Sequence, residues 1–307
     1  MPRPAAARPS RAFPSSTAAR RPRPFARMTP DTPSPASEQP AIAFIGGGNM
    51  ASAIIGGLIR QGMPASGIEV VEPWEEARAA LRAHHGIEAL PEAGTALERA
   101  GVVVWAVKPQ TFKEAAQQAR AHTANAVHLS VAAGIRSDSI AAWLGSDCVV
   151  RAMPNTPALI GRGMTALYAR PQVSPAQRAA VQQVLSSTGE LLWVDEEPQL
   201  DAVTALSGSG PAYVFLFLEA MARAGVEMGL APEQAHQLAV GTFTGASELA
   251  RRSDESPAVL RQRVTSKGGT TFAAVQAMEQ AGVPEHFIRA MKAAQARARE
   301  LGDEFGR

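Results

Sequence analysis

A glycine-rich segment lies between an apolar stretch and a helical one. Residues 46–51 read GGGNMA, the pattern G-x-G-x-x-A, and directly follow the apolar run of residues 41–45. The first glycine permits a tight turn, the second lets a pyrophosphate approach the backbone, and the alanine allows close packing of a helix on a strand. The N–H groups that open the helix favour an anion. In this strand–turn–helix context the pattern predicts a dinucleotide site.

An acidic residue ends the second predicted strand. That strand, residues 68–71, is followed by Glu72. A carboxylate here accepts hydrogen bonds from a ribose 2′-hydroxyl and repels a 2′-phosphate, so Glu72 favours NADH. Arg78 and Arg82, on the next helix, offer a cation to a 2′-phosphate, so the sequence leaves both NADPH and NADH open. The plainer alternative is that Glu72 is an exposed acid at a strand end.

Three further strings follow predicted parallel strands. They are AVKPQ at residues 106–110, SVAAG at 130–134 and MPNTP at 153–157. Open α/β sheets bind ligands at the carboxyl ends of their strands, so we assign all three to the cofactor crevice. Within the first string, Lys108 contacts either the ribose and phosphates of the cofactor or only solvent.

Two strings in the last third of the chain combine glycine with hydroxyl residues. Residues 206–211 read LSGSGP and residues 264–271 read VTSKGGTT, and each leads into a predicted helix. Such helix-opening loops expose backbone N–H groups, which bind an anion such as a substrate carboxylate without an arginine. The alternative is that their Ser and Thr side chains only cap the helices.

The other reactive groups narrow the chemistry. The sequence has no HExxH or HxxEH pair and no nucleophile elbow, so we predict no metal site. The last third holds two lysines, Lys267 and Lys292. Reduction of an imine needs orientation and a hydrogen bond to nitrogen, whereas an alcohol dehydrogenase needs a Lys, His or Tyr to move the hydroxyl proton. These residues fit imine reduction better.

The elements that must position these residues alternate between strand and helix. Continuous apolar strands separated by helices predict a mostly parallel sheet buried on both faces, an α/β fold of the Rossmann-type, doubly wound class. The predicted strands are residues 41–45, 68–71, 102–107, 126–131, 148–151, 164–169 and 191–194. The predicted helices between them are residues 49–61, 74–84, 110–122, 137–144 and 175–187.

The last third predicts helices alone, an all-helical dimerisation domain. The runs are residues 211–228, 232–251, 257–264, 271–280 and 284–301, most with a proline in the opening turn. The first run is apolar almost all round, and a segment of roughly 110 residues is too small to cover it. We therefore expect a second subunit to cover it, in an obligate dimer or larger assembly.

Composition excludes several classes of protein. The single Cys148 lies in an apolar strand, forms no internal disulfide and indicates core packing in a reducing, cytoplasmic setting. No window is apolar enough for a membrane helix. Seven arginines and no acids fall in residues 1–27, so the rest of the chain is acidic with 23 basic and 28 acidic residues, which argues against a nucleic-acid partner.

The N-terminal 40 residues have a different composition. They are rich in Pro, Ala, Arg and Ser, which predicts a disordered extension. A transit peptide is the alternative, but six prolines before residue 25 would break the amphipathic helix that it needs. Because Met28 offers a second start, we expect translation to begin there and residues 1–27 to have been added by assigning the start too early.

Taken together, these motifs resemble one family. Residues 44–51, 106–109, 151–157, 206–213 and 264–271 closely resemble, in order and spacing, pyrroline-5-carboxylate reductase. The likeness runs from about residue 41 to residue 301, and LSGSGPAY is its most specific string. It implies reduction of 1-pyrroline-5-carboxylate to L-proline with NADPH or NADH, in homodimers that interleave their helical domains and assemble further, into decamers.

The resemblance also implies roles for individual residues. Thr271 matches the threonine whose hydroxyl binds the ring nitrogen, and the substrate carboxylate falls to the backbone of the loop that contains Ser266, Gly269 and Thr270. Glu197 falls on a position near the active site. The cofactor contacts match Ile45, Gly46, Gly47, Gly48, Asn49 and Met50 in the first turn, and Ala106, Val107, Lys108 and Pro109 after the third strand.

Three positions depart from the family pattern. Lys267 stands where the family most often has proline, Gly241 replaces a usual glutamine, and Glu72 stands where many relatives have a small polar residue that favours NADPH. We expect residues 41–196 to form the dinucleotide-binding domain and residues 197–307 the helical domain. The rival enzyme is a hydroxyacid dehydrogenase with Lys292 as its catalytic lysine, and the non-enzymatic rival is a cofactor-sensing or scaffold protein.

Overall fold

The computed structural model describes residues 41–306. The prediction of a disordered extension at residues 1–40, and of a start at Met28, lies outside the described residues.

The dinucleotide-type part is built on one seven-stranded sheet, in the order β2-β1-β3-β4-β5-β6-β7. The first five strands run parallel, β6 is antiparallel to β5, and β7 is parallel to β6. The strands are β1 (Ala41–Ile45), β2 (Ile68–Val71), β3 (Ala100–Trp105), β4 (Val127–Ser130), β5 (Val149–Met153), β6 (Gly163–Ala169) and β7 (Gly189–Trp193). The strand order reverses at β1, which places the switch point of the sheet between β1 and β3.

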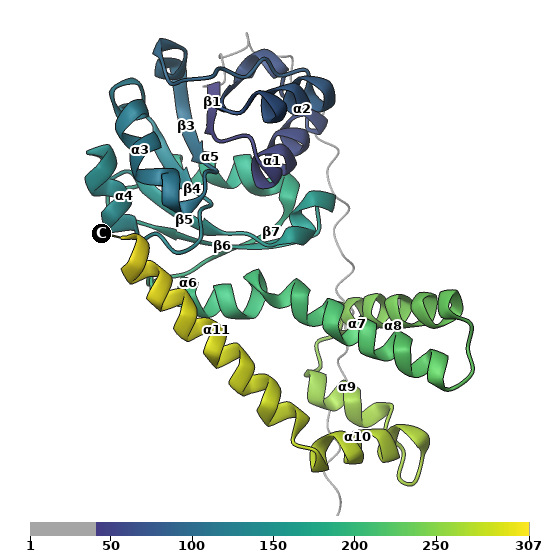
Figure 1. The fold of residues 1–307 in the computed structure, drawn as a ribbon. Coiled ribbons are helices and arrows are strands. Elements are labelled where there is room, and N and C mark those ends of the chain that lie inside the picture. The colour runs from purple at the N-terminus through teal and green to yellow at the C-terminus, as the bar shows by residue number, and fades with distance from the viewer. Residues whose placement is uncertain (1–40, 307) are drawn as a thin grey trace, which may run out of the picture. The chain divides into compact units, whose positions relative to one another are not determined.

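Helices cover both faces of this sheet (Figure 1). Phe44 and Val104 point into one core with α1 (Asn49–Arg60), α2 (Glu75–His85) and α5 (Pro175–Leu185). Ala43 and Val103 point into the other core with α3 (Pro109–Ala119) and α4 (Ser137–Leu144). The predicted α/β class and its two-sided burial are confirmed. Short 3₁₀ turns occupy Ala65–Gly67, Thr95–Arg99, Arg120–His122, Thr156–Ile160 and Ser186–Thr188.

The second core contains a buried polar pair. The indole Nε1 of Trp105 donates a hydrogen bond to Nδ1 of His128 across 3.2 Å, and both side chains are fully buried. Burial lowers the pKa of His128 to about 4, because the apolar surroundings disfavour the imidazolium form. The histidine therefore acts as a neutral acceptor within the core.

Beyond β7 the described chain is helical, as predicted. The elements are α6 (Gln199–Val203), a π-helical turn (Thr204–Gly208), α7 (Gly210–Glu227), α8 (Pro232–Arg252), α9 (Pro257–Arg263), α10 (Thr270–Gln280) and α11 (Val283–Phe305). A proline lies in the first turn of α7, α8, α9 and α11, where its missing N–H removes no helical hydrogen bond. None of the described helices is long and apolar enough to cross a membrane.

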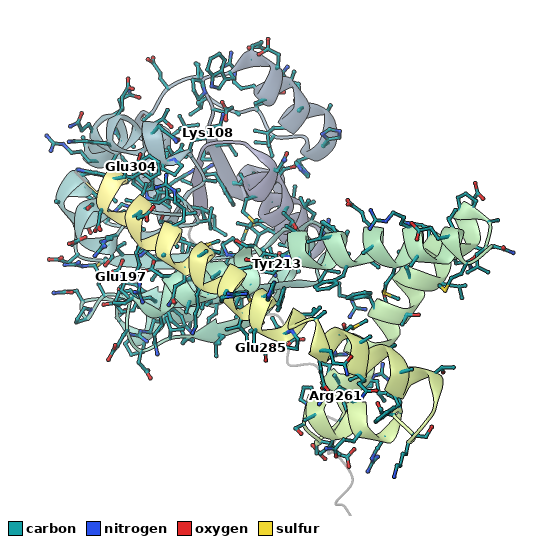
Figure 2. All side chains as sticks on the ribbon, turned by 60° about the horizontal axis from the view of Figure 1, so that its bottom comes forward. Lys108, Glu197, Tyr213, Arg261, Glu285 and Glu304 are labelled. Carbon is teal, nitrogen blue, oxygen red and sulfur yellow. The ribbon has the colours of Figure 1, made fainter. Side chains whose placement is uncertain are left out.

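The last helix connects the sheet to α10. Near its end, Asp303 pairs with Arg136 across 2.5 Å, and the carbonyl of Gly306 accepts from the Ser139 hydroxyl across 2.9 Å. Its start follows α10 directly, so α9 and α10 lie at the other end of α11 (Figures 1 and 2). At 1.5 Å per residue its 23 residues span about 34 Å.

Helices α7 and α8 expose a large apolar surface. Phe215 and Leu216 of α7 are 57% and 63% exposed, and Leu238 of α8 is 58% exposed. This confirms that the chain leaves these helices uncovered. One prediction about the core is wrong: Cys148 precedes β5 instead of lying within it, and its side chain is only half-buried.

Candidate active site

The glycine-rich turn joins the carboxyl ends of β1 and β3. Gly46 has φ +96°, and a Cβ built on it would lie 2.7 Å from the carbonyl oxygen of Ala106. Its N–H donates to the Val71 carbonyl across 2.8 Å, and the N–H of Ala106 donates to the Ile45 carbonyl across 2.8 Å. The left-handed backbone and the close approach both require glycine. The fold thus brings residues 45–50 beside residues 106–109.

The start of α1 fits an anionic group. Gly48 is its N-cap, with φ −70° and no side-chain hydrogen bond, and the first turn contains no acidic residue. A Cβ built on Gly48 would meet no atom within 4 Å, so the space above it is open. The first backbone N–H groups of α1 have no helical partner and carry the positive end of the helix dipole. This cradle matches the pyrophosphate of a dinucleotide.

Glu72 closes the other side of the turn. It is buried, with 6% of the residue exposed, so the alternative of an exposed strand-end acid is wrong. Its Oε2 accepts from the Gly47 N–H across 2.7 Å and its Oε1 from the Trp74 N–H across 3.0 Å. The carboxylate therefore lies directly against the glycine-rich turn.

Both nearby arginines are already engaged. Arg78 donates to the carbonyls of Glu72 and Pro73 across 2.9 and 2.7 Å and pairs with Glu75. Arg82 pairs with Glu88 across 2.8 Å, and the hydrogen bond with Glu88 raises the pKa of Arg82. Lys108 is exposed at the N-cap of α3 (Figure 2).

The strings MPNTP and LSGSGP meet in the fold. The Asn155 amide donates to the carbonyl and hydroxyl of Ser207 across 3.2 and 3.1 Å and accepts from the Met164 N–H across 3.0 Å. The Tyr213 hydroxyl donates to the Ala205 carbonyl across 3.0 Å. The expected loop at residues 206–211 is wrong, because these contacts hold the segment in a π-helical turn that runs into α7.

The second string, VTSKGGTT, forms a helix-opening turn as predicted. Gly268 has φ +77°, and the Gly269 N–H donates to the Ser266 carbonyl across 3.0 Å. Gly269 is the N-cap of α10 without a side-chain hydrogen bond, and the first turn contains no acid. Among the described residues, no group is hydrogen-bonded to the hydroxyl of Thr270 or of Thr271. The turn therefore presents backbone N–H groups and two hydroxyls.

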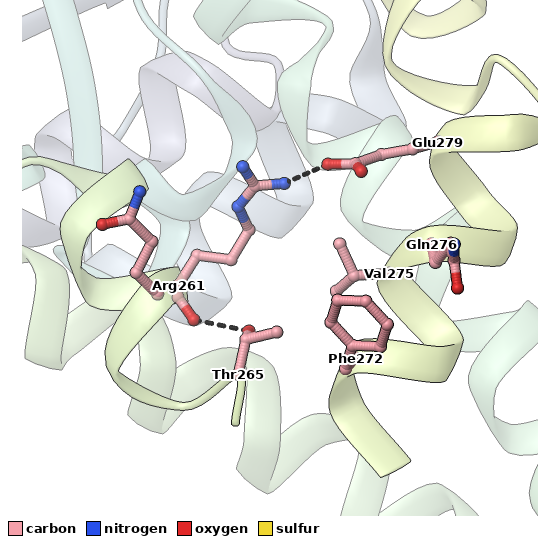
Figure 3. Close-up of a pocket in the computed structure, with 7 residues that line it drawn as sticks. Arg261, Thr265, Phe272, Val275, Gln276 and Glu279 are labelled. Atoms are coloured by element: carbon pink, nitrogen blue, oxygen red, sulfur yellow. Dashed lines mark hydrogen bonds and ion pairs between the residues drawn. The ribbon is translucent and has the colours of Figure 1, made fainter. Parts of the chain in front are cut away.

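A hollow of 360 Å³ lies beside this turn, between α9 and α10 (Figure 3). The Arg261–Glu279 ion pair, 2.7 Å long, borders it on one side, and Phe272 and Val275 of α10 border it on the other. The Thr265 hydroxyl donates to the Arg261 carbonyl across 2.7 Å, which fixes the start of the turn to α9. The remaining lining residues are Gln262, Thr265 and Gln276.

Glu197 ties the sheet to the helical part. Its carboxylate accepts from the Ser137 N–H across 2.6 Å, from the Ser137 hydroxyl across 2.5 Å and from Arg151 across 2.7 Å. It thus adds a negative charge to that of Asp138 at the start of α4. Burial raises the pKa of nearby Asp201, against the opposing effect of Arg151, Arg136 and Arg299.

Comparison with known proteins identifies the chain. Residues 197–301 match the family model described as pyrroline-5-carboxylate reductase dimerisation, and residues 41–134 match the NADP oxidoreductase, coenzyme F420-dependent, model. A pyrroline-5-carboxylate reductase of Pseudomonas aeruginosa is 46% identical over 269 residues, which are 87% of this chain and 98% of that relative. The chain belongs to the pyrroline-5-carboxylate reductase family.

Solved structures of pyrroline-5-carboxylate reductases support the same family assignment. A pyrroline-5-carboxylate reductase from Coxiella burnetii matches with a TM-score of 0.79 and 37% identity, covering 85% of this chain and 97% of that one. The Plasmodium falciparum pyrroline carboxylate reductase, solved with NADP bound, matches with a TM-score of 0.78 and 25% identity, covering 86% and 99%. The resemblance found in the motifs is confirmed, and the dimerisation model indicates a homo-oligomer.

Three residues of this reductase fold connect distant segments in a way that the sequence alone did not predict. Asn155, Ser137 and Arg151 link segments that are 52, 60 and 46 residues from their partners. Arg151 had left a signal, a charged residue inside an otherwise apolar strand, and it is 8% exposed. A buried arginine needs an acidic partner, but only the fold shows that this partner is the half-buried Glu197.

Proposed function

We propose that this chain reduces 1-pyrroline-5-carboxylate to L-proline with NAD(P)H. The observation that carries the proposal is the presence, in a chain of this family, of two uncapped helix starts. One is the α1 cradle with open space above Gly48, and the other is the hydroxyl-bearing start of α10. The first suits a pyrophosphate and the second a carboxylate beside a ring nitrogen.

We assign the two sites as follows. Residues 41–196 form the dinucleotide-binding domain and residues 197–307 the helical domain. Ile45 to Met50 and Ala106 to Pro109 hold the cofactor, which supplies the hydride when bound. The backbone of Ser266, Gly269 and Thr270 holds the substrate carboxylate, and the Thr271 hydroxyl donates a hydrogen bond to the ring nitrogen. Glu197 is a positioning residue, because three donors already occupy its carboxylate.

The reaction mainly requires the protein to position the substrate and the cofactor relative to each other. A hydride added to the imine carbon moves the C=N electron pair onto the ring nitrogen, which takes up a proton from water to become the amine of proline, and a hydrogen bond from Thr271 stabilises the charge that develops there. The carboxylate at the α10 start fixes one face of the ring toward the nicotinamide. No buried lysine or histidine is required for this step, and Lys292, the candidate of the hydroxyacid dehydrogenase alternative, is exposed on α11.

We further propose that two subunits build each site. The substrate turn opens α10, which precedes α11, and the far end of α11 pairs with Arg136 beside the sheet, so α10 and the roughly 34 Å of α11 lie between the turn and the sheet along the chain. Within one chain this span is too long for hydride transfer. A partner that packs on the exposed faces of α7 and α8 would bring its own turn to this chain's cofactor. Further assembly of such dimers, to a decamer, and a cytoplasmic location complete the proposal.

Mixed dimers test the shared site. A Thr271→Ala subunit lacks the substrate contact, and a Gly48→Val subunit has its cofactor cradle filled. If each site takes its turn from one subunit and its cofactor from the other, co-refolded mixtures regain activity, since one of the two sites in the mixed dimer is intact. If each chain builds its own site, every site carries a lesion and mixing restores nothing.

One assay tests the proposed reaction. Oxidation of NAD(P)H is followed with pyrroline-5-carboxylate and with no substrate, and reduction of NAD(P)+ is followed with a 3-hydroxyacid. Turnover only in the first case is expected. Turnover with the hydroxyacid favours the dehydrogenase alternative, and binding of cofactor without turnover of either substrate favours a cofactor sensor.

Multi-angle light scattering of the wild type and of Leu216→Glu tests the assembly, since a charge on the exposed apolar face of α7 should yield monomers.

A further inference from the structure

We propose that the adenosine end of the cofactor site selects NADH over NADPH, and that Glu72 is the residue that does so. The inference rests on the proposed function only to the extent that the chain binds a nicotinamide dinucleotide. One solved relative has NADP bound and the model matched by residues 41–134 is described as an NADP oxidoreductase, so the inference rests on this chain's own Glu72 and not on its relatives.

The position of the Glu72 carboxylate carries the inference. Its two oxygens accept from the N–H groups of Gly47 and Trp74, one on each side of the turn. Each carboxylate oxygen has two acceptor positions, so each keeps one for a ribose hydroxyl. These hydrogen bonds fix the carboxylate at the carboxyl end of β2, next to the glycine-rich turn of β1, where the adenosine ribose lies in such folds.

Packing prevents the carboxylate from moving away. A Cβ built on Gly47 would lie 3.4 Å from the Cγ and Oε2 of Glu72 and 2.6 Å from Cδ1 of Leu81. The side chain is thus held between the turn and α2, and the residue is only 6% exposed. A 2′-phosphate brought to this ribose would face a fixed negative charge with little water to screen it.

The two neighbouring arginines do not neutralise the Glu72 carboxylate for an approaching 2′-phosphate, because both already have partners. The Arg78 guanidinium is occupied by the carbonyls of Glu72 and Pro73 and by Glu75. Arg82 is paired with Glu88. A 2′-phosphate would have to break one of these sets of contacts to gain an arginine, whereas a 2′-hydroxyl needs neither.

Equilibrium binding by calorimetry tests the proposal without turnover. We expect the wild type to bind NADH roughly tenfold or more tightly than NADPH, and ADP-ribose more tightly than its 2′-phosphate. Glu72→Ser should reduce or reverse the ratio, even if it weakens both ligands by freeing the Gly47 N–H. Glu72→Gln, which keeps the shape and removes the charge, should lie between. Glu76→Gln, which changes an exposed acid in the first turn of the following helix α2, is the matched control and should leave the ratio unchanged.

The outcomes separate this inference from the proposed function. Wild-type protein that binds NADPH as tightly as NADH, or more tightly, overturns the selectivity and leaves the reductase assignment intact. A Glu72→Ser variant that folds and keeps the wild-type ratio overturns the role of Glu72. If that variant does not fold, the wild-type affinities for ADP-ribose and for its 2′-phosphate still decide whether the adenosine end distinguishes a 2′-hydroxyl from a 2′-phosphate. Binding of neither dinucleotide contradicts both proposals.

Discussion

Asn155 and Ser207 join the end of β5 to the π-helical turn through two hydrogen bonds from one amide group, 3.2 and 3.1 Å long. The same asparagine accepts from the Met164 N–H. One side chain therefore connects the fifth strand, the sixth strand and the segment that leads into α7. The string MPNTP contributes at least this structural link, in addition to any contact with a cofactor.

Removing this link should destabilise the fold. Asn155→Ala leaves the half-buried Met164 N–H and Ser207 carbonyl without their partner, and we expect a loss of about 1–3 kcal/mol in the free energy of unfolding. Ser207→Ala removes only one acceptor and should cost under about 1 kcal/mol. Urea denaturation followed by circular dichroism measures both. Equal stability of the two variants would mean that the asparagine carries no such link.

Two glycines of the first turn should respond to alanine in opposite ways. Gly46→Ala places a Cβ 2.7 Å from a backbone carbonyl at φ +96°, so it should lower stability, by about 1–3 kcal/mol from the backbone conformation alone. Gly48→Ala meets no atom and has an ordinary φ, so it should fold as the wild type but weaken dinucleotide binding. Melting temperatures and calorimetry separate the effects. Unchanged binding by Gly48→Ala would remove the α1 start from the cofactor site.

The turn before α10 provides a paired test of the chemistry. Thr271→Ala removes the proposed hydrogen bond to the ring nitrogen and should lower kcat by roughly tenfold to a hundredfold. Thr270→Ala keeps the backbone N–H groups that hold the carboxylate, so its kcat and KM should stay close to the wild-type values. Steady-state kinetics with pyrroline-5-carboxylate gives both. Equal effects of the two substitutions would mean that Thr271 has no special role.

The sequence predicted features that depend on neighbours along the chain. The strands, most helices and the tight turn at Gly46 follow from apolar periodicity and from residues that open or break helices. The π-helical turn was missed, because Gly208, Ser209 and Gly210 favour a loop locally and contacts from Asn155 and Tyr213 override that preference.

The burial of Glu72 was missed for the same physical reason. Its position at a strand end was readable, but its hydrogen bond to Gly47 joins residues 25 apart and requires the packing of β2 against β1. The link from Glu197 to Ser137 and Arg151 is likewise set by the fold. The composition of the 264–271 turn indicated an anion site without showing that α10 and α11, the latter about 34 Å long, lie between it and the contacts with the sheet part.

The buried His128 should make stability depend on pH. Burial lowers its pKa from 6.5 to about 4. Between these values the unfolded chain binds a proton that the folded chain does not, so stability rises with pH in this window. The contribution is complete above pH 6.5 and is lost as the pH falls toward 4. At about 1.4 kcal/mol per pH unit, this shift sets an upper bound of about 3–4 kcal/mol.

His128→Asn isolates this contribution. The asparagine Oδ1 can accept from the Trp105 indole near the position of Nδ1, and it does not titrate in this range. We expect the wild type to lose more unfolding free energy than the variant between pH 7 and pH 4.5, as measured by urea denaturation at each pH. Comparing the two proteins cancels the carboxylates, which titrate in both. Parallel pH profiles would show that His128 takes up its proton as readily in the folded chain as in the unfolded one.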